Sequence, residues 1–71
     1  MKTTQCERIL RHLIDFGTIT SLEAIQEYGI LRLASRINDL RREGYNITSE
    51  RGSGKNRYDE MTHFTIYRLK R

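Results

Sequence analysis

The sequence predicts an α+β domain of three short helices followed by a hairpin, with a small antiparallel sheet of two or three strands. Apolar residues recur at helical spacing in three successive segments, and each segment ends at a glycine: Gly17, Gly29 or Gly44. Two alternating segments follow, separated by a polar stretch with glycines, which is typical of a hairpin. With 71 residues and no proline, the chain is predicted to be a single domain over residues 1–71 with one small core.

The first helix is expected to begin at Thr4, because Glu7 three residues later completes the pattern of a capping box. Gly17 is expected to end it. The next two residues, Thr18 and Ile19, are too few for a free-standing strand and are expected to pair as a third strand with the hairpin. The apolar stripe of this helix is predicted to consist of Cys6, Ile9, Leu10, Leu13 and Ile14.

The second and third helices are expected to be joined by a tight turn that contains Gly29. Thr20 and Glu23 form another capping box, which predicts where the second helix begins. Two capped helices joined in this way match the helix-turn-helix plan, here over about residues 20–44. The expected apolar faces are Leu22, Ile25 and Tyr28 on the second helix and Leu33, Ile37 and Leu40 on the third, which spans about residues 31–43.

The last two strands are expected over residues 45–51 and 61–69, with a polar turn region at 52–59. Tyr45 and Ile47 are expected to face inward. The returning strand does not alternate cleanly, because Phe64 and Ile66 fall on the face opposite its other apolar residues. Either a bulge switches the register, or both side chains face outward; the sequence leaves both open. With the wing over about residues 45–69, the element order is that of a winged helix-turn-helix fold.

Three stretches carry a resemblance to known domains: Ser21-Leu22-Glu23-Ala24 to Gly29-Ile30, Arg32-Leu33-Ala34-Ser35-Arg36-Ile37, and Leu40-Arg41-Arg42-Glu43-Gly44-Tyr45. They resemble the small helix-turn-helix domains common in bacteriophages and prophages, and the resemblance covers about residues 3–51 and the closing Tyr67-Arg68-Leu69. More distantly, the chain is similar to the amino-terminal winged helix of the biotin repressor. Leu31 stands where such domains usually have Ser or Thr to cap the recognition helix, and loss of that bond costs about 1 kcal/mol.

Positive charge is concentrated in residues 32–57, where seven basic and three acidic side chains account for the whole net charge of +4. Such a surface favours phosphate as a partner. Arginine suits guanine edges and phosphate, asparagine suits adenine, and serine reaches either phosphate or base. The alternative is a solvated helix face, and Arg36 also suits an ion pair with Glu23 or Asp39. The DNA-binding residues expected on the third helix are Arg32, Ser35, Arg36, Asn38 and Arg42.

The basic wing is expected to lie along the DNA backbone or minor groove, where its glycines permit close approach. Its alternative is a mobile, soluble hairpin tip. Thr20 and Ser21 are secondary candidates for phosphate contact at the start of a helix, although capping alone explains them. The contact residues expected in the wing are Arg51, Lys55, Asn56 and Arg57.

Catalysis, metal binding and a cofactor are not expected, nor is a small-molecule substrate. Cys6, His12 and His63 have no zinc-type spacing and are interpreted as a core cysteine and surface histidines. No catalytic arrangement of Ser, His, Cys and carboxylates is visible.

No apolar run reaches about 18 residues, so no membrane association is expected. The first residues lack a secretory signal. A lone cysteine favours the cytoplasm, and the resemblance implies a bacterial cell with the gene carried by a phage. The starting Met1 and the closing strand lead us to expect a whole protein.

These patterns predict a double-stranded DNA-binding domain, and the resemblance implies a phage or prophage transcriptional regulator or an accessory factor for replication or recombination. A single module buries roughly 600–1,000 Å² on DNA, so useful specificity calls for a homodimer or a neighbouring protein. The alternative is a protein-interaction module that modulates a host or phage protein through Leu31, Phe64 and Ile66. RNA binding ranks last, because no aromatic stacking platform is present.

Overall fold

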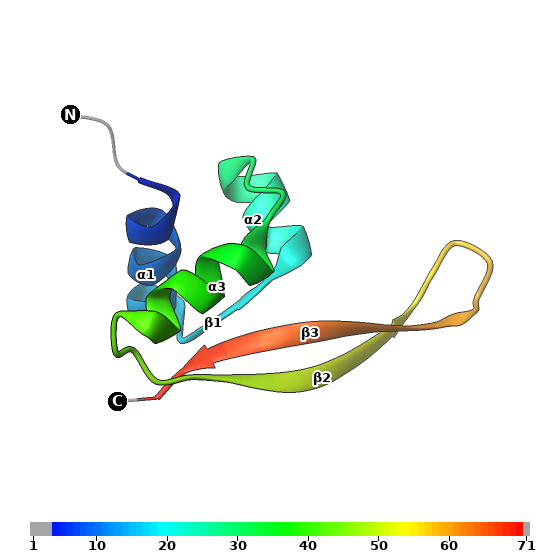
Figure 1. The fold of residues 1–71 in the computed structure, drawn as a ribbon. Helices are drawn as coiled ribbons and strands as arrows, with labels where there is room; N and C mark the ends of the chain where they lie inside the picture. Colours follow the sequence, from blue (N-terminus) through cyan, green and yellow to red (C-terminus); the bar gives the residue numbers. More distant parts are fainter. Residues whose placement is uncertain (1–3, 71) are drawn as a thin grey trace.

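The computed structural model describes residues 4–70, so the sequence expectations for residues 1–3 and 71 lie outside this range. Figure 1 shows the three helices gathered at one end of the sheet, with the β2–β3 hairpin extending far beyond them. The predicted α+β winged helix-turn-helix fold is confirmed. Within the described range no helix is both long enough and apolar enough to cross a bilayer. The elements are α1 (Gln5–Phe16), β1 (Thr18–Thr20), α2 (Ser21–Tyr28), α3 (Leu33–Arg42), β2 (Ile47–Lys55) and β3 (Met61–Leu69).

The ends of α1 and α2 lie where their capping residues predict. The Thr4 hydroxyl accepts a hydrogen bond from the Glu7 amide at 3.1 Å. At Thr20 both reciprocal bonds of the capping box with Glu23 are present. Gly17 and Gly29 follow the two helices with φ values of 85° and 66°, a left-handed conformation in which glycine has no steric penalty.

The sheet has the strand order β1-β3-β2, and both strand pairs are antiparallel. β1 pairs with β3 as predicted, with Ile19 opposite Tyr67. Along β2 and β3 the register runs without interruption from Ile47–Leu69 to Lys55–Met61, which excludes a bulge in the hairpin. Because side chains alternate between the two faces of a strand, Phe64 and Ile66 lie on the outer face, opposite to Tyr67 and Leu69, which pack against the core. This decides between the two alternatives that the sequence leaves open.

The core lies between the helices and the inner face of the sheet. The predicted stripe of α3 is confirmed in full, whereas that of α1 is confirmed in part, because Ile14 is 47% exposed. The predicted face of α2 is confirmed only at Tyr28, which is half-buried and packs against the core. Leu22 and Ile25 are 62% and 43% exposed, and Ala24 is buried instead. The small side chain of Ala24 lets the backbone of α2 approach the core closely. The core residues are Ile9, Leu13, Ile19, Ala24, Ile30, Leu33, Ile37, Leu40 and Ile47.

Two predictions for the hairpin are wrong. The predicted turn region begins too early, because β2 continues to Lys55. A Cβ atom at Gly52 would lie 2.5 Å from the ring of Phe64, so the glycine is part of a strand over which that ring packs. Tyr45 does not face inward but is 41% exposed. Its amide donates to the carbonyl of Leu40 at 3.2 Å, so Tyr45 completes the end of α3 and the strand begins only at Ile47.

His12 is buried, with 5% exposure, which corrects the expectation of a surface histidine. Its Nδ1 lies 2.6 Å from the hydroxyl of Tyr28, and its ring centroid lies 4.7 Å from that of Phe16. The imidazole therefore joins α1 to α2 and helps to fix the angle at which the helix-turn-helix unit is held.

Candidate nucleic-acid interface

The exposed face of α3 follows from its narrow buried side. Leu33, Ile37 and Leu40 are buried, so the opposite side of the helix faces solvent, with Asn38 exposed and Ser35 half-buried. The capping position is Arg32 rather than Leu31, one residue later than predicted.

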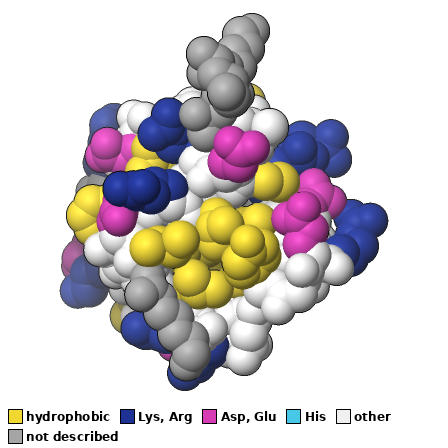
Figure 2. Space-filling view, turned by 90° about the vertical axis from the view of Figure 1, so that its left-hand side faces the viewer, with side chains coloured by type: hydrophobic (Ala, Val, Ile, Leu, Met, Phe, Trp, Pro, Cys, Tyr) yellow, Lys and Arg dark blue, Asp and Glu magenta, His cyan; other side chains and the backbone are white. Residues whose placement is uncertain are grey.

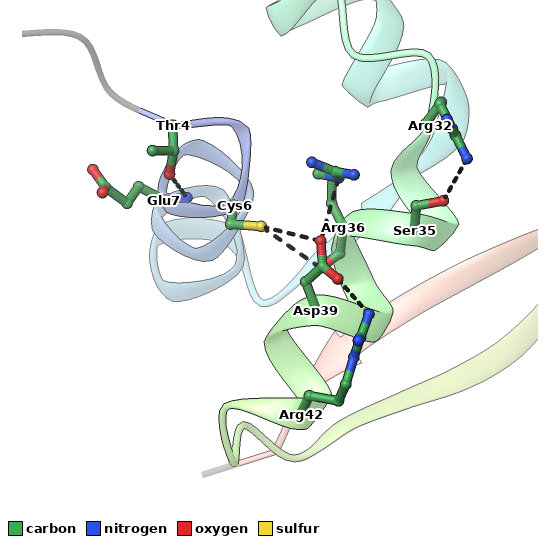
Figure 3. Close-up of polar contacts among 8 residues, drawn as sticks. All are labelled: Thr4, Cys6, Glu7, Arg32, Ser35, Arg36, Asp39 and Arg42. Atoms are coloured by element: carbon green, nitrogen blue, oxygen red, sulfur yellow. Dashed lines mark hydrogen bonds and ion pairs between the residues drawn. The ribbon is translucent and has the colours of Figure 1, made fainter.

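The Arg32 side chain makes no capping hydrogen bond. Its Nη2 lies 3.5 Å from Oγ of Ser35, and Figure 3 shows these two side chains together at the start of α3. The expected absence of a side-chain cap is therefore confirmed, and it leaves the Arg32 guanidinium exposed at the amino-terminal end of the helix.

Asp39 holds two of the candidate arginines (Figure 3). Its Oδ1 accepts a hydrogen bond from Nη2 of Arg42 at 2.6 Å, and its Oδ2 lies 3.6 Å from Nε of Arg36. Of the two partners considered for Arg36 from the sequence, the structure has Asp39 and not Glu23. Arg36 is half-buried with an enclosed Nε, whereas the side chain of Arg42 is 78% exposed. Arg42 can therefore reach a ligand from α3, and Arg36 belongs to the junction of α1 and α3.

Cys6 completes this junction from α1. Its Sγ lies 4.0 Å from Oδ2 of Asp39 and 4.0 Å from the carbonyl oxygen of Arg36. Burial, and next the negative charge of Asp39, raise the pKa of the Cys6 thiol. The protonated thiol is thus the favoured form. α1 is packed against this side of α3, which leaves the remaining polar side of α3 open.

Arg41 is a structural residue that the sequence reasoning missed. Its Nε donates to the carbonyl of Ile47 and its Nη2 to Oγ of Ser49, both at 2.9 Å. The guanidinium also lies 5.9 Å from the ring centroid of Tyr67, within the range of a cation–π interaction. Arg41 therefore fixes α3 to β2 and β3. Its place in sequence, next to Arg42 at a helix end, gives no sign of which arginine faces the sheet.

The wing presents basic side chains on the same side of the sheet as α3. Ser49 faces α3, because Arg41 binds it. Alternation along the strand puts Arg51 and Lys55 on that same face, and both are exposed. Nζ of Lys55 lies 3.3 Å from Oδ1 of Asp59. Within residues 4–70, Arg51 and Arg57 have no carboxylate within 4.0 Å.

The turn of the wing is organised by Asn56. Its Oδ1 accepts from the amides of Tyr58 and Glu60 at 2.9 and 3.1 Å, and its Nδ2 donates to Oε1 of Glu60 at 3.3 Å. Asp59 has a φ of 63°, which Asp tolerates better than most residues. Asn56 therefore shapes the turn that presents Lys55 and Arg57.

The outer face of the sheet carries a different kind of surface. Phe64 is 44% exposed and Ile66 is half-buried. Phe64 lines an apolar groove together with Leu22, with Thr20 at the end of β1 and with Ser21 at the start of α2. Leu31, which is 79% exposed, follows the other end of α2. The structure thus brings Phe64 and Ile66 together but leaves Leu31 apart from them.

On the outer face of the sheet, Glu50 and Arg68 form an ion pair with each other, so neither charge is left for a ligand. Nε of Arg68 donates to Oε1 of Glu50 at 2.7 Å. This hydrogen bond lowers the pKa of Glu50 and raises that of Arg68. Both groups are therefore ionised and paired, and the basic residues of the wing that lack such a partner lie on the side of α3 or at the turn.

Comparison with known proteins identifies one family. A family model described as a winged helix-turn-helix domain matches residues 4–70, so that the match includes the three helices and the whole hairpin. No curated protein and no solved structure matches the chain.

Proposed function

The chain belongs to the family of winged helix-turn-helix domains, and from this premise we propose that it binds double-stranded DNA with α3 in the major groove and the wing on the flanking backbone. Family membership implies DNA binding. One observation carries the proposed geometry: the exposed basic side chains of α3 and of the wing lie on the same side of the molecule. Arg32 and Arg42 lie at the two ends of α3, and Arg51 and Lys55 lie on the α3 side of the wing.

The side chains between these cations are suited to reading bases. Asn38 is exposed on α3, and an asparagine amide pairs with adenine in the major groove. Ser35 lies beside Arg32 and can reach a phosphate or a base. Arg36 and Asn56 act indirectly in this proposal, because Arg36 is held by Asp39 and Asn56 closes the wing turn.

Phosphates supply the remaining contacts. Arg57, at the turn of the wing, would neutralise the backbone. Ser21 is exposed at the start of α2 and offers a secondary phosphate contact. The Thr20 hydroxyl is engaged in the capping box, so Thr20 would contribute through its place at the helix start. The resemblance to phage and prophage domains supports a phage-encoded transcriptional regulator, or an accessory factor for replication or recombination.

Fluorescence anisotropy with a random-sequence duplex, over a series of salt concentrations, tests this function. We expect binding that weakens with salt by a slope corresponding to about three to six phosphate contacts. Arg32→Ala and Arg51→Ala should each weaken binding and reduce the slope by about 1. Arg11→Ala is the matched control, because it removes the same charge from an exposed position of α1 and should leave the slope unchanged. No binding at low salt, or equal losses in all three folded variants, would refute the proposed interface.

A protein-interaction module is the second candidate, and the groove between Leu22 and Phe64 is the observation that favours it. An apolar groove on a small domain is typical of a docking surface. In that case Phe64→Ser would leave DNA binding at the level of the wild-type chain but abolish capture of a protein partner. A wild-type chain that binds no DNA and retains a partner through Phe64 would favour this candidate over the first.

A further inference from the structure

The end of the domain opposite the wing carries an exposed apolar patch. It consists of Leu10 and Ile14 of α1, Tyr45 after α3 and Leu69 at the end of β3, and we call it the α1 patch. Ile14 and Tyr45 are 47% and 41% exposed. Figure 2 views the molecule from this end and shows hydrophobic side chains gathered at the centre of the face, with charged side chains around them. A contiguous apolar patch of this kind indicates an interaction surface.

The two ends of the α1 patch differ in charge. Leu10 and Tyr45 line two adjoining hollows, one of which is also lined by Glu7 and Glu43 and the other by Lys70. Within the part of the chain that the structure describes, none of these three charged side chains has an ion-pair partner within 4.0 Å. The patch therefore has an acidic end, an apolar centre and a basic end.

We propose that the α1 patch is the interface of a symmetric homodimer. A two-fold axis that lies in the plane of the patch, between its two ends, sets the acidic end of one protomer against the basic end of its partner. Glu7 and Glu43 then face Lys70 of the partner subunit, the apolar centres meet, and the two α1 helices run antiparallel. An isologous interface requires this kind of self-complementarity, and the distribution of charge over the patch provides it.

A dimer of this kind needs only a modest part of the chain's surface. A stable interface buries about 800 Å² on each partner, which is roughly a seventh of the 5489 Å² exposed by the chain. The apolar residues of the patch would form the centre of this interface. Glu7, Glu43 and Lys70 would form its polar rim, as in the usual anatomy of protein interfaces.

The dimer leaves the wing and the start of α3 open. In Figure 1 the wing projects from the end opposite the α1 patch, so pairing through the patch covers neither the wing nor the α3 side of it. Two α3 helices related by a two-fold axis read two inverted half-sites. This use on DNA rests on the proposed function, whereas the dimer itself does not.

Sedimentation equilibrium of the chain without DNA tests the dimer. The wild-type chain should sediment with twice the mass of 8.5 kDa. Glu43→Lys and Lys70→Glu should each weaken dimerisation by about tenfold or more, because each places like charges across the interface. The combined Glu43→Lys/Lys70→Glu variant again sets opposite charges at positions 43 and 70 across the interface, although Glu7 keeps its charge, and should form a tighter dimer than either single variant. Arg57→Glu, a charge reversal at the wing turn, is the control and should have no effect.

A wild-type chain that stays monomeric up to about 1 mM would overturn the dimer. So would single reversals without effect, or a combined variant that stays as weak as its parents. Circular dichroism confirms that each variant is folded. A monomer that still binds duplex DNA by anisotropy would overturn the dimer and leave the proposed function standing, and a dimer that binds no DNA would do the reverse.

Discussion

Replacing Gly52 by alanine tests the packing that holds the wing in its extended form. A Cβ atom at this position would lie 2.5 and 2.7 Å from two ring atoms of Phe64 and 3.0 Å from Cδ1 of Ile66. Carbon atoms in contact prefer about 3.5–4.0 Å, so the ring would have to move by about 1 Å. Overpacking of this kind costs about 1–3 kcal/mol, while removing a glycine from a strand recovers about 0.5–1 kcal/mol. We therefore expect Gly52→Ala to lower the free energy of unfolding by about 0.5–2 kcal/mol.

A double-mutant cycle with Phe64→Ala assigns that loss to the ring. Once the ring is absent, the new methyl group meets only the flexible end of Ile66, so Gly52→Ala should become neutral or slightly stabilising in that background. The coupling free energy between the two positions is then about 1–3 kcal/mol. Urea denaturation monitored by circular dichroism measures it, and about 1 kcal/mol corresponds to a shift of some 4–8 °C in Tm for a domain of this size.

Gly54→Ala is the matched control for this cycle. A Cβ atom there would lie 3.9 Å from the same ring, which is an ordinary van der Waals contact, so the substitution should be tolerated. If Gly52→Ala were as stable as the wild-type chain, or if its effect were the same with and without the Phe64 ring, the packing argument would be refuted.

Two further predictions concern the helices. Thr20→Ala removes the capping box of α2 and should lower the free energy of unfolding by about 1 kcal/mol, as measured by thermal denaturation. Thr20→Ser keeps the capping hydroxyl, so an equal loss of stability in that variant would contradict the assignment. Because burial and Asp39 raise the pKa of Cys6, the folded state favours the protonated thiol and should lose stability as pH rises above the thiol pKa of the unfolded chain. Alkylation of Cys6 by iodoacetamide should accordingly require a higher pH in the folded chain than in urea, and coinciding pH profiles would contradict this.

The sequence predicts the parts of this fold that depend on neighbouring residues. Thr20 and Glu23 are three residues apart, and their reciprocal bonds determine where α2 begins. Gly17 and Gly29 end helices because of their own backbone conformation. The stripe of α3 is also a local pattern, since it needs only helical spacing. Such features could be predicted without knowledge of the rest of the molecule.

The features that the sequence did not predict depend on contacts between distant segments. β2 extends through Gly52 because the ring of Phe64 packs over it from the other strand. His12 is buried because Tyr28 of another helix offers it a hydroxyl group. Arg41 fixes α3 to the sheet because its guanidinium donates a hydrogen bond to the carbonyl of Ile47. In each case the residue type allows several roles, and only the tertiary arrangement selects one.

The same distinction separates the cations of residues 32–57 into two groups. Arg36 is half-buried beside Asp39 and Arg41 is fixed by two hydrogen bonds to β2, so neither is available to a phosphate. The ion pairs of Arg42 and Lys55 are exposed, and pairs of this kind contribute only about 0–1 kcal/mol, so a phosphate can replace the carboxylate.

Five cations therefore remain for DNA: Arg32, Arg42, Arg51, Lys55 and Arg57. Each phosphate neutralised contributes about −0.9 to the slope of log K against log salt concentration, so one chain can account for a slope of about −4.5 at most. A steeper slope would require more cations than one chain offers on this side. Two chains joined through the α1 patch would supply them, because the pairing leaves Arg32 and the wing cations of both chains open. The salt dependence of DNA binding thus indicates how many cations contact the DNA, and from that number how many chains are bound.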